Sequence, residues 1–479
     1  MINREQYEKE ILAAKEKQIG SLSRRLSEVF SVNTNIREQE ITEKPDDALL
    51  EEIKNIEIPR SGRDAEEVAD ELVNKVFKTS LLTQHPRFFS FVASGVSPYS
   101  IAGSILSDIY NINNCGYETA PPISLIEEKL IRWMGSRAGF GDECGGVFTS
   151  GGSLSNLTGM IAARGNRLTE DEYPIGTAYL SDQAHSSVKK GLRLMGIRSD
   201  NIIIIPSDDQ FRMRCDLLEQ AIENDIMNGK KPFLVVGTLG TTNTGSIDPL
   251  DTISEIASAH DMWMHVDGAF GGSILFSDIY NHLAKGIEKA DSLSWDTHKW
   301  AMQVYSCSCI IAKNKKDLIN VFAEHPEYLE DVINSEHTDS WDLGIEMSRP
   351  ARAVKLWYTV QAMGTDLLAD VIDYPFFYSS LVKKELEKLS DWEITSPPMC
   401  GTITFRFAPD GLSDREIDDL NGAISRRIID ENYAYIVTTT IKNKRVLRMN
   451  MINCNTTDDD VISTVRHLDE IARDLYGKN

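Results

Sequence analysis

The sequence has few cysteines and no long apolar run. Seven of its 479 residues are cysteine, an odd number without paired CxxC spacing, so a disulfide framework or a zinc ribbon is not expected. No apolar stretch approaches the roughly 20 residues that a membrane span requires. The first residues, MINREQYEKEILAAKEKQIG, are charged throughout and lack the apolar core of a signal peptide. These absences predict a cytoplasmic protein with reduced thiols and no metal site.

Positive charge is also scarce. The chain has 50 Lys and Arg against 73 Asp and Glu, a formal net charge of −23, which argues against nucleic acid and anionic membranes as partners. With 41% hydrophobic and 26% charged residues, the composition is that of a globular protein with a full core. We therefore expect an enzyme of two or three domains that acts on a small molecule.

The pattern along the chain predicts three parts. Residues 1–84 are polar, with helical spacing over residues 11–30, and we expect this helical or extended segment to pack on a partner subunit. Residues 85–355 form a large α/β domain, because the apolar runs GGVFTS, GTAYLSD, NIIIIPS and PFLVVGTLGTT alternate with helical stretches. This alternation is typical of a mostly parallel sheet covered on both faces. Residues 356–479 are expected to form a smaller α+β domain with an antiparallel sheet.

Residues with distinctive chemistry follow the apolar runs, where parallel strands present their carboxyl ends to ligands. Residues 149–153 (TSGGS) open a helix and suit a phosphate group. His185 follows the second run, Asp267 follows MWMHV, and Lys299 lies among bulky neighbours in WDTHKW. Singly, each has an ordinary explanation: a helix cap, a loop histidine, a capping acid and a surface lysine. Together they are what pyridoxal phosphate requires.

The chemistry of this cofactor explains the combination. A lysine bonds covalently to it, and we expect burial and nearby cations to lower the pKa of Lys299 and make it nucleophilic. An aspartate such as Asp267 keeps the pyridine nitrogen protonated, which makes the ring an electron sink.

Five motifs, in this order, resemble those of the group II pyridoxal-phosphate-dependent amino acid decarboxylases: FTSGGSLSNL, SDQAHSS, TLGTTNTGSID, HVDGAFGG and WDTHKW. The resemblance runs from about His85 to Trp357 and more loosely beyond. The stretches HPRFFSFV, PEYL and SRPARAVKLW are most similar to bacterial tryptophan and other aromatic L-amino-acid decarboxylases. The resemblance implies fold type I with a seven-stranded type of sheet, pyridoxal 5′-phosphate as cofactor, and a homodimer with shared active sites.

The resemblance also implies residue roles. Lys299 would bond to the cofactor, Asp267 would pair with the pyridine nitrogen, and Ala269 would pack beneath the ring. His185 would stack on the other face and hold the substrate carboxylate out of the ring plane. The remaining cofactor contacts would be Gly152, Ser153 and His298 at the phosphate and Thr242 at the polar edge of the ring.

The acid that returns a proton to Cα is less well defined. In animal members of the family, a tyrosine on a mobile loop donates this proton, and the corresponding place here is near Ser340. Tyr328 is the only tyrosine between Ser306 and Trp357, and it is either this catalytic acid or a packing residue. Residues 331–344 are polar and poor in apolar side chains, so we expect them to form the lid.

Four residues fall at the family's substrate-binding positions, which come from both subunits: Phe91, Asn113, Trp341 and Met347. The three apolar side chains suit an aromatic substrate, although the ordinary explanation of Phe91 and Met347 is that they are core residues. No arginine is evident at these positions, which disfavours glutamate. Asn113 stands where tryptophan-specific members have a histidine, so the choice of aromatic ring is open.

The sequence therefore predicts an aromatic L-amino-acid decarboxylase, which converts tryptophan, phenylalanine or tyrosine to the arylethylamine and CO2. Three alternatives are open. The first is a decarboxylase of an acidic or aliphatic amino acid such as glutamate. The second is a decarboxylation-dependent aldehyde synthase, against which His185 argues mildly. The third is a non-catalytic binding protein, against which the complete set of cofactor motifs argues.

Overall fold

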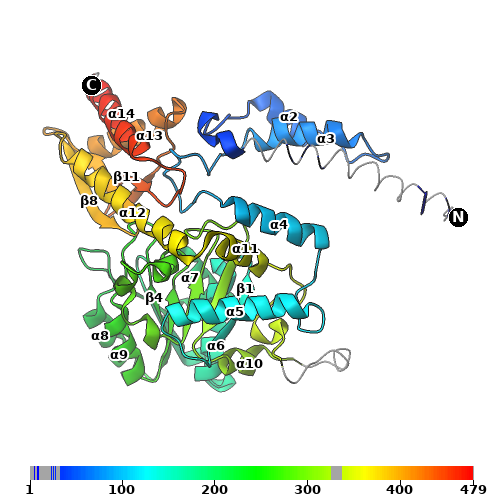
Figure 1. The fold of residues 1–479 in the computed structure, drawn as a ribbon. Helices are drawn as coiled ribbons and strands as arrows, with labels where there is room; N and C mark the ends of the chain where they lie inside the picture. The colour runs from blue at the N-terminus through cyan, green and yellow to red at the C-terminus, as the bar shows by residue number, and fades with distance from the viewer. Residues whose placement is uncertain are drawn as a thin grey trace.

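The computed structural model describes residues 33–324 and 337–477, together with residues 5, 8, 9, 23, 25 and 27. Most of residues 11–30, all of Tyr328 and the first part of the expected lid therefore lie outside the described residues. Figure 1 shows a large α/β body, a smaller layer of strands and helices near the C-terminus, and N-terminal helices that extend to one side. No helix of the described parts is long and apolar enough to cross a membrane.

Seven strands form the central sheet, in the order β1-β7-β6-β5-β4-β2-β3. Their bounds are β1 Gly145–Thr149, β2 Gly176–Ser181, β3 Ile202–Ile205, β4 Lys231–Thr238, β5 Trp263–Asp267, β6 Ser292–Trp295 and β7 Ser308–Ala312. The pairs among β2 to β6 are parallel, and β7 runs antiparallel to both β1 and β6. The predicted mostly parallel sheet is confirmed. Strand β7 reverses direction because the short connection from β6 contains no crossover helix.

Helices cover both faces of this sheet, as predicted. One face carries α6 Gly152–Arg167, α7 Ser186–Leu194 and α10 Lys316–Phe322, and the other carries α5 Pro121–Arg137, α8 Cys215–Met227 and α9 Leu250–Ala259. Side chains of β4 alternate between the two cores: Leu234 and Val236 pack on the α6 side and Val235 on the opposite side. Short 3-10 helices span Asn33–Glu38, Glu170–Ile175, Ser199–Asn201, Gly271–Phe276, Asn281–Ala284, Ile287–Lys289 and Ser340–Leu343.

The C-terminal part contains a four-stranded antiparallel sheet in the order β10-β11-β9-β8. Its elements are β8 Trp392–Met399, β9 Thr402–Phe407, α13 Asp414–Asp430, β10 Thr438–Ile441, β11 Lys444–Asn450 and α14 Asp458–Tyr476. Helices α4 Pro98–Tyr110 and α11 Ala353–Met363 pack together beside the large domain. Helix α12 Thr365–Leu386 joins the two parts: Leu368 and Ile372 belong to the large core, and Val382 and Leu386 to the small one.

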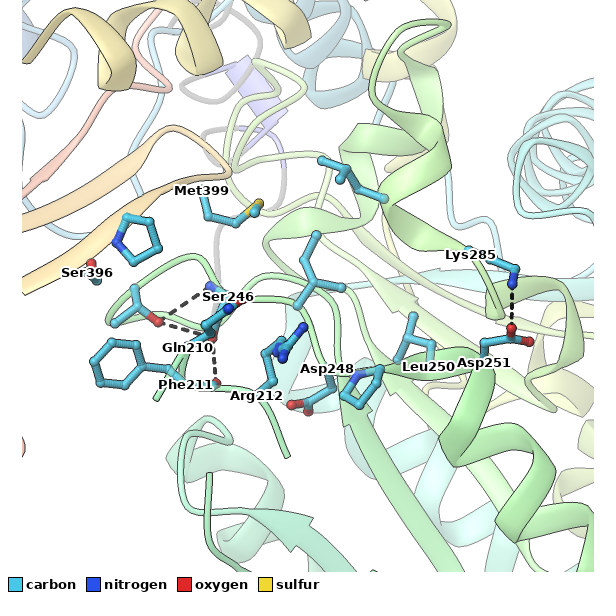
Figure 2. Close-up of a pocket in the computed structure, with 15 residues that line it drawn as sticks. Gln210, Phe211, Arg212, Ser246, Asp248, Leu250, Asp251, Lys285, Ser396 and Met399 are labelled. Carbon is cyan, nitrogen blue, oxygen red and sulfur yellow. Dashed lines mark hydrogen bonds and ion pairs between the residues drawn. The ribbon is translucent and has the colours of Figure 1, made fainter. Parts of the chain in front are cut away.

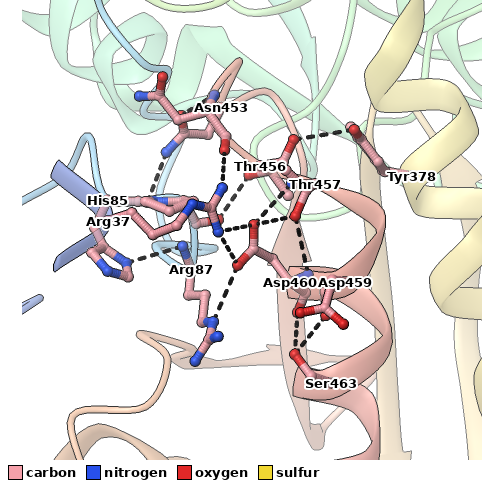
Figure 3. Close-up of polar contacts among 12 residues, drawn as sticks. Arg37, His85, Arg87, Tyr378, Asn453, Thr456, Thr457, Asp459, Asp460 and Ser463 are labelled. Carbon is pink, nitrogen blue, oxygen red and sulfur yellow. Dashed lines mark hydrogen bonds and ion pairs between the residues drawn. The ribbon is translucent and has the colours of Figure 1, made fainter. Parts of the chain in front are cut away.

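The N-terminal segment is hydrogen-bonded to the C-terminal part of its own chain (Figure 3). The buried carboxylate of Asp460 accepts hydrogen bonds from Arg37 Nη1 at 2.7 and 2.8 Å and from Arg87 Nε at 3.2 Å. Burial by itself would raise the pKa of Asp460, but the bonds from Arg37 and Thr457 outweigh it and the pKa is lowered. Helices α2 Asp47–Lys54 and α3 Ala65–Glu71 and the π-helix Leu72–Phe77 have no buried residues.

Candidate active site

A cavity of about 340 Å³ lies at the carboxyl ends of the central strands. All eight residues that the sequence assigns to the cofactor line it: Gly152, Ser153, His185, Thr242, Asp267, Ala269, His298 and Lys299. They come from the ends of β1, β2, β4, β5 and β6 or from the segments that follow them. Strand β1 runs in the same direction as β2, β4, β5 and β6, because β7 is antiparallel to both β1 and β6. The carboxyl ends of these strands meet at one edge, which brings together residues up to 147 positions apart in sequence, Gly152 and Lys299.

The start of α6 fits the phosphate of pyridoxal phosphate. This helix begins at Gly152 directly after β1, and no side chain caps it, so its first N–H groups are available to an anion. A Cβ atom on Gly152 would lie 2.7 Å from Asp296 Oδ2 and 2.9 Å from the Cβ of Ala269. Only glycine therefore leaves room at this position.

Asp267 fits the ring nitrogen of the same cofactor. It ends β5 with a buried carboxylate, and its Oδ1 accepts from Ala269 N at 3.1 Å and from Ser294 Oγ at 3.3 Å. Two residues earlier, His265 is fully buried between Asn156 Oδ1 at 3.0 Å and Ser292 Oγ at 2.8 Å. Burial lowers the pKa of His265 to about 4, so this histidine is neutral and structural.

Lys299 Nζ lies 3.0 Å from Asp296 Oδ2. Burial lowers the pKa of Lys299, but the carboxylates of Asp296 and Asp267 outweigh it, and the net direction is upward. The expectation that nearby cations lower this pKa was wrong, because the charged side chains nearest to the amine are acids. Beside it, His298 places Nδ1 3.0 Å from the carbonyl oxygen of Cys307, and burial lowers its pKa.

His185 both caps α7 and lines the cavity. It is the N-cap of α7, where its Nδ1 accepts a hydrogen bond from Ser187 N at 3.2 Å and lies 2.7 Å from Ser187 Oγ. Because Nδ1 accepts a hydrogen bond from a backbone N–H, a neutral ring carries its proton on Nε2. The helix cap thus fixes both the tautomer and the direction of a ring that lines the cavity.

Sequence reasoning missed two ionisable residues that line this cavity. Asp296, in the motif that contains Lys299, is 2% exposed, and its Oδ1 has no hydrogen-bond partner among the described residues. Tyr305 stands with its ring centroid 4.7 Å from that of His298. Burial raises the pKa of Tyr305 although Lys299 opposes this effect. Tyr305 lies one residue before the segment from Ser306 to Trp357, in which Tyr328 is the only tyrosine.

The four predicted substrate residues do not line the cavity of a single chain. Phe91 is half-exposed, with φ of 56°, a left-handed conformation that is uncommon for a non-glycine residue. Its carbonyl oxygen accepts from Arg448 Nη1 at 2.7 Å, and Arg448 Nε donates to the carbonyl oxygen of Asn243 at 3.3 Å. Since Asn243 follows Thr242, Phe91 lies near the rim of the cavity.

Arg448 is the third residue that sequence reasoning missed. It is 4% exposed, no acidic partner is found for it among residues 33–324 and 337–477, and its Nη2 has no hydrogen-bond partner there. Burial lowers its pKa to about 10. A buried guanidinium therefore contacts the backbone of Phe91, although none of the four predicted substrate positions is an arginine. The sequence does contain a signal for this residue: Arg448 stands within an apolar strand, where a solvent-exposed arginine is not expected.

Asn113, Trp341 and Met347 lie in a different region. Asn113 Oδ1 accepts from Arg349 N at 3.1 Å, and Trp341 is 5% exposed and donates its backbone N–H to the carbonyl oxygen of Cys115 at 3.3 Å. Met347 is 42% exposed. The expectation that Met347 is a core residue does not hold in the single chain.

The described part of the expected lid, residues 337–344, is packed on the large domain. The ring of His337 stacks on Tyr117 with centroids 3.7 Å apart, and Asp339 Oδ1 accepts from Tyr117 N at 2.7 Å. Trp341 and Leu343 are buried in the 3-10 helix that follows. Residues 337–344 are thus packed in the single chain, and their role as a lid stays a prediction.

A second cavity of about 350 Å³ contains none of the predicted site residues (Figure 2). Phe211, Asp248 and Met399 are among its lining residues. Asp248 accepts from Met213 N at 2.7 Å and from Thr238 N at 2.8 Å, and burial raises its pKa to about 6. Because Thr238 ends β4 and lines the first cavity, Asp248 fixes one wall of the candidate active site.

Known proteins were compared with this chain. The family model described as the pyridoxal-dependent decarboxylase conserved domain matches residues 48–408. An aromatic-L-amino-acid decarboxylase of Bacillus atrophaeus is 31% identical over 444 residues, 92% of each chain. The cysteine sulfinic acid decarboxylase of Homo sapiens is 30% identical and covers 79% of this chain and 78% of its own length. The structure of Oryza sativa TDC with PLP and tryptamine has a TM-score of 0.90 at 22% identity and covers 96% of this chain and 98% of its own.

Proposed function

Because the chain belongs to the pyridoxal-dependent decarboxylase family, and is a pyridoxal-phosphate-dependent amino acid decarboxylase of fold type I, we propose that its substrate is an aromatic L-amino acid. The products would be the arylethylamine of tryptophan, phenylalanine or tyrosine and CO2. The observation that carries this proposal is the half-exposed side chain of Phe91, whose backbone carbonyl accepts from Arg448, a residue that also bonds to Asn243 next to the cavity residue Thr242. Similarity to the Bacillus atrophaeus enzyme over 92% of both chains supports it.

Each residue of the cavity would have a separate role in binding the cofactor or in the reaction. The bound cofactor supplies an electron sink for the electron pair that is left when CO2 departs. Lys299 would anchor it covalently, and the Asp267 carboxylate would hold a proton at its ring nitrogen. Ala269 would support one face of the ring and His185 the other, where the His185 ring would turn the substrate carboxylate out of plane. Departure of a charged carboxylate as a neutral gas is favoured by an enclosed, water-poor site.

The opposite end of the cavity would bind the phosphate. The uncapped N–H groups at Gly152 and Ser153 and the ring of His298 would hold it, and Thr242 would contact the polar edge of the ring. The α6 dipole favours an anion at this end. A fixed phosphate would in turn fix the position of the reacting carbon over Lys299.

The final proton transfer to Cα has two candidate donors. Tyr328, from the sequence, would act from the segment between residues 306 and 357. Tyr305 lines the cavity beside His298 and is the alternative donor. We retain Tyr328 as the proposed acid, and substitution of each tyrosine distinguishes them.

We also propose that the enzyme is a homodimer with shared active sites. Asn113, Trp341 and Met347 would then contact the substrate of the partner subunit. Large apolar side chains exposed on α4 and in the N-terminal segment support this proposal: Ile58 is 93% exposed, Phe77 66%, Ile109 70% and Tyr110 72%. Such surfaces usually lie in interfaces. The boundaries at residues 84 and 355 stay predictions.

A second substrate class is favoured by Arg448. A buried guanidinium without an acidic partner, close to Phe91, is what an anionic substrate side chain would require. The human relative of 30% identity is a cysteine sulfinic acid decarboxylase. The alternative is therefore a decarboxylase of an acidic amino acid or a sulfinate.

A competition assay tests these proposals. The enzyme is incubated with an equimolar mixture of the twenty amino acids and cysteine sulfinate, and amines, aldehydes and ammonia are quantified by mass spectrometry and a coupled assay. We expect an aromatic amine to lead by about 10³-fold in kcat/KM over glutamate, since an unpaired anionic side chain costs several kcal/mol to bury. An acidic substrate in the lead would replace the aromatic proposal, and aldehyde with stoichiometric ammonia would indicate an aldehyde synthase.

Variants of Arg448 distinguish the aromatic proposal from the acidic alternative in this assay. Under the aromatic proposal, Arg448→Leu and Arg448→Lys change KM for the aromatic substrate to a similar extent. Under the acidic alternative, Arg448→Leu abolishes turnover of the acidic substrate, and Arg448→Lys preserves part of it because the charge is retained.

A further inference from the structure

Tyr305 stands on a segment without regular secondary structure. Residues 302–307 connect the turn that carries Lys299 to β7, and no helix or strand includes them. Tyr305 itself is exposed and lines the first cavity, with its ring centroid 4.7 Å from that of His298. The side chain of such a segment keeps a fixed place only if other parts of the chain hold the backbone beside it.

Lys355 on α11 holds this segment at two points. Its Nζ donates to the carbonyl oxygen of Val304 at 3.2 Å and to that of Ser306 at 2.9 Å, and these two residues flank Tyr305. The side chain of Lys355 is buried, and it does not line the cavity. Lys355 therefore contacts the neighbours of Tyr305 from the side of the core, out of reach of a molecule bound in the cavity.

The buried amine of Lys355 is costly for a residue that only fills space. It has no salt bridge within the described parts of the chain, and burial lowers its pKa. A methionine of similar length would occupy the same space without removing an amine from water. The bonds to the two carbonyl oxygens are what offsets this cost, so the function of the amine lies in the segment that it holds.

Two other buried side chains support the same segment. Ser100 on α4 accepts from Val304 N at 2.9 Å, and Thr359, one turn after Lys355 on α11, lies 3.3 Å from the amide group of Gln303. Helices α4 and α11 pack on each other, so these contacts come from a rigid pair of elements. Lys355 differs from the other two residues because it bonds on both sides of Tyr305.

We propose that Lys355 is a positioning residue for the decarboxylation, which holds the Tyr305 side chain as a fixed wall of the cavity beside His298 and Lys299. Lys355 acts through Tyr305 and touches neither substrate nor cofactor. The proposal rests on the proposed function, in which this cavity binds the amino acid substrate. A fixed wall keeps the substrate in one orientation, whereas a mobile ring would lose part of its contact with it.

A double-mutant cycle tests the proposal in the full chain with its cofactor. The variants are Lys355→Met, Tyr305→Ala and the two combined, assayed by steady-state kinetics with the amino acid that leads the competition assay. We expect Lys355→Met to raise KM by about tenfold, the effect of losing the contacts of one aromatic ring, and to change kcat by less than about threefold. In the Tyr305→Ala background, the same change should alter KM by less than about twofold.

Backbone hydrogen exchange provides a measurement that needs no substrate. In Lys355→Met, the amides of residues 304–307 should exchange about tenfold faster or more, because the backbone beside Tyr305 is released, while the amides of β5 and β6 should not change. The visible absorption and the dissociation constant of the cofactor should be those of the wild type, since none of the proposed cofactor contacts is altered.

A control and a second variant keep the result specific. Lys383→Met removes an exposed lysine of α12 whose partner Glu387 is also exposed, and it should behave as the wild type. Lys355→Gln keeps a polar end but is one bond shorter than lysine, so it should not reach both carbonyl oxygens. It replaces Lys355→Met in the cycle if that variant does not fold.

Three outcomes would overturn the proposal. A KM effect of Lys355→Met that persists in full in the Tyr305→Ala background shows that Lys355 does not act through Tyr305. A weaker cofactor affinity with unchanged KM assigns the effect to His298, whose Nδ1 accepts from Cys307 N at 3.2 Å. Unchanged KM and unchanged exchange exclude a positioning role. Failure of the proposed function looks different, because the wild type would then release no amine from any amino acid in the competition assay.

Discussion

The guanidinium of Arg349 and the carboxylate of Glu127 form a buried ion pair, with 2.6 Å between Nη2 and Oε2. Arg349 also donates to the carbonyl oxygen of Phe148 at 2.9 Å and to Ser340 Oγ at 2.8 Å, and Glu127 accepts from Asn114 Nδ2 at 2.7 Å. One ion pair thus connects β1, which leads to the phosphate end of the cavity, with the segments that carry Asn113 and Trp341.

Removal of one partner should destabilise the fold strongly. Glu127→Gln leaves the guanidinium buried without a counter-charge, and we expect the free energy of unfolding to fall by about 3 to 5 kcal/mol. Urea denaturation measures it. The neighbouring variant Glu128→Gln, whose partner Arg132 is exposed, should change it by less than about 1 kcal/mol. Equal effects of the two variants would contradict a structural role of the buried pair.

Lys299→Ala should abolish turnover and the visible absorption of the bound cofactor. The other lysine that burial affects, Lys355, donates to the carbonyl oxygens of Val304 and Ser306 and does not line the cavity. Borohydride reduction of the wild type followed by peptide mapping should therefore label Lys299. Labelling of a different lysine would refute the proposed attachment.

Asp267→Asn should retain the cofactor and lose rate. The proposed phosphate contacts, Gly152, Ser153 and His298, are unchanged in this variant, but the charge that would hold the proton on the ring nitrogen disappears. We expect kcat to fall by about 10²-fold or more, since each 1.36 kcal/mol of lost stabilisation is a factor of ten. Steady-state kinetics with a parallel cofactor titration separates the two effects, and a rate within threefold of the wild type would exclude the electron-sink role.

Tyr328→Phe and Tyr305→Phe should differ in their products. If Tyr328 returns the proton to Cα, its replacement slows amine release and raises the fraction of aldehyde and ammonia formed in air. Tyr305→Phe should leave this fraction unchanged. Product ratios by mass spectrometry decide between them, and the reverse pattern would assign the acid to Tyr305 and make Tyr328 a packing residue.

His265 should make stability depend on pH. Burial holds its pKa at about 4 in the folded chain, whereas the unfolded value is about 6.5, so the unfolded state binds the proton between these values. Its contribution is complete above pH 6.5 and falls as pH drops toward 4, by about 2 kcal/mol between pH 7 and pH 5. His265→Gln should flatten the pH dependence of unfolding, and a substitution of the exposed His282 should leave the curve unchanged.

The sequence predicted the central sheet and the cofactor cavity well for a common physical reason. Fully buried parallel strands read as continuous apolar runs, and the residues that follow each run meet at one edge of the sheet. The position of His185 or Asp267 in the cavity therefore depends on local pattern and strand direction alone. The function of each of these residues is still a prediction, and the variants above test it.

Other features depended on contacts that a linear pattern does not contain. Strand β8 contains Pro397 and Pro398, which a sheet tolerates only at an edge, and it was missed. Arg448 became significant only when the fold brought it beside Phe91. The upward direction of the Lys299 pKa depends on the carboxylates of Asp296 and Asp267, and their approach to the amine is a tertiary contact that the sequence does not show.

Helix α12 restricts how substrate reaches the cavity. Its first half packs in the core of the large domain and its second half in the core of the small one, within a single run of 22 residues. A hinge between the domains would have to pull one half of this helix out of its core and expose large apolar side chains to water. Rotation of the C-terminal domain is therefore a costly route for substrate entry. The passage to Lys299 should open and close by rearrangement of surface segments, while the two domains keep one fixed relative orientation throughout turnover.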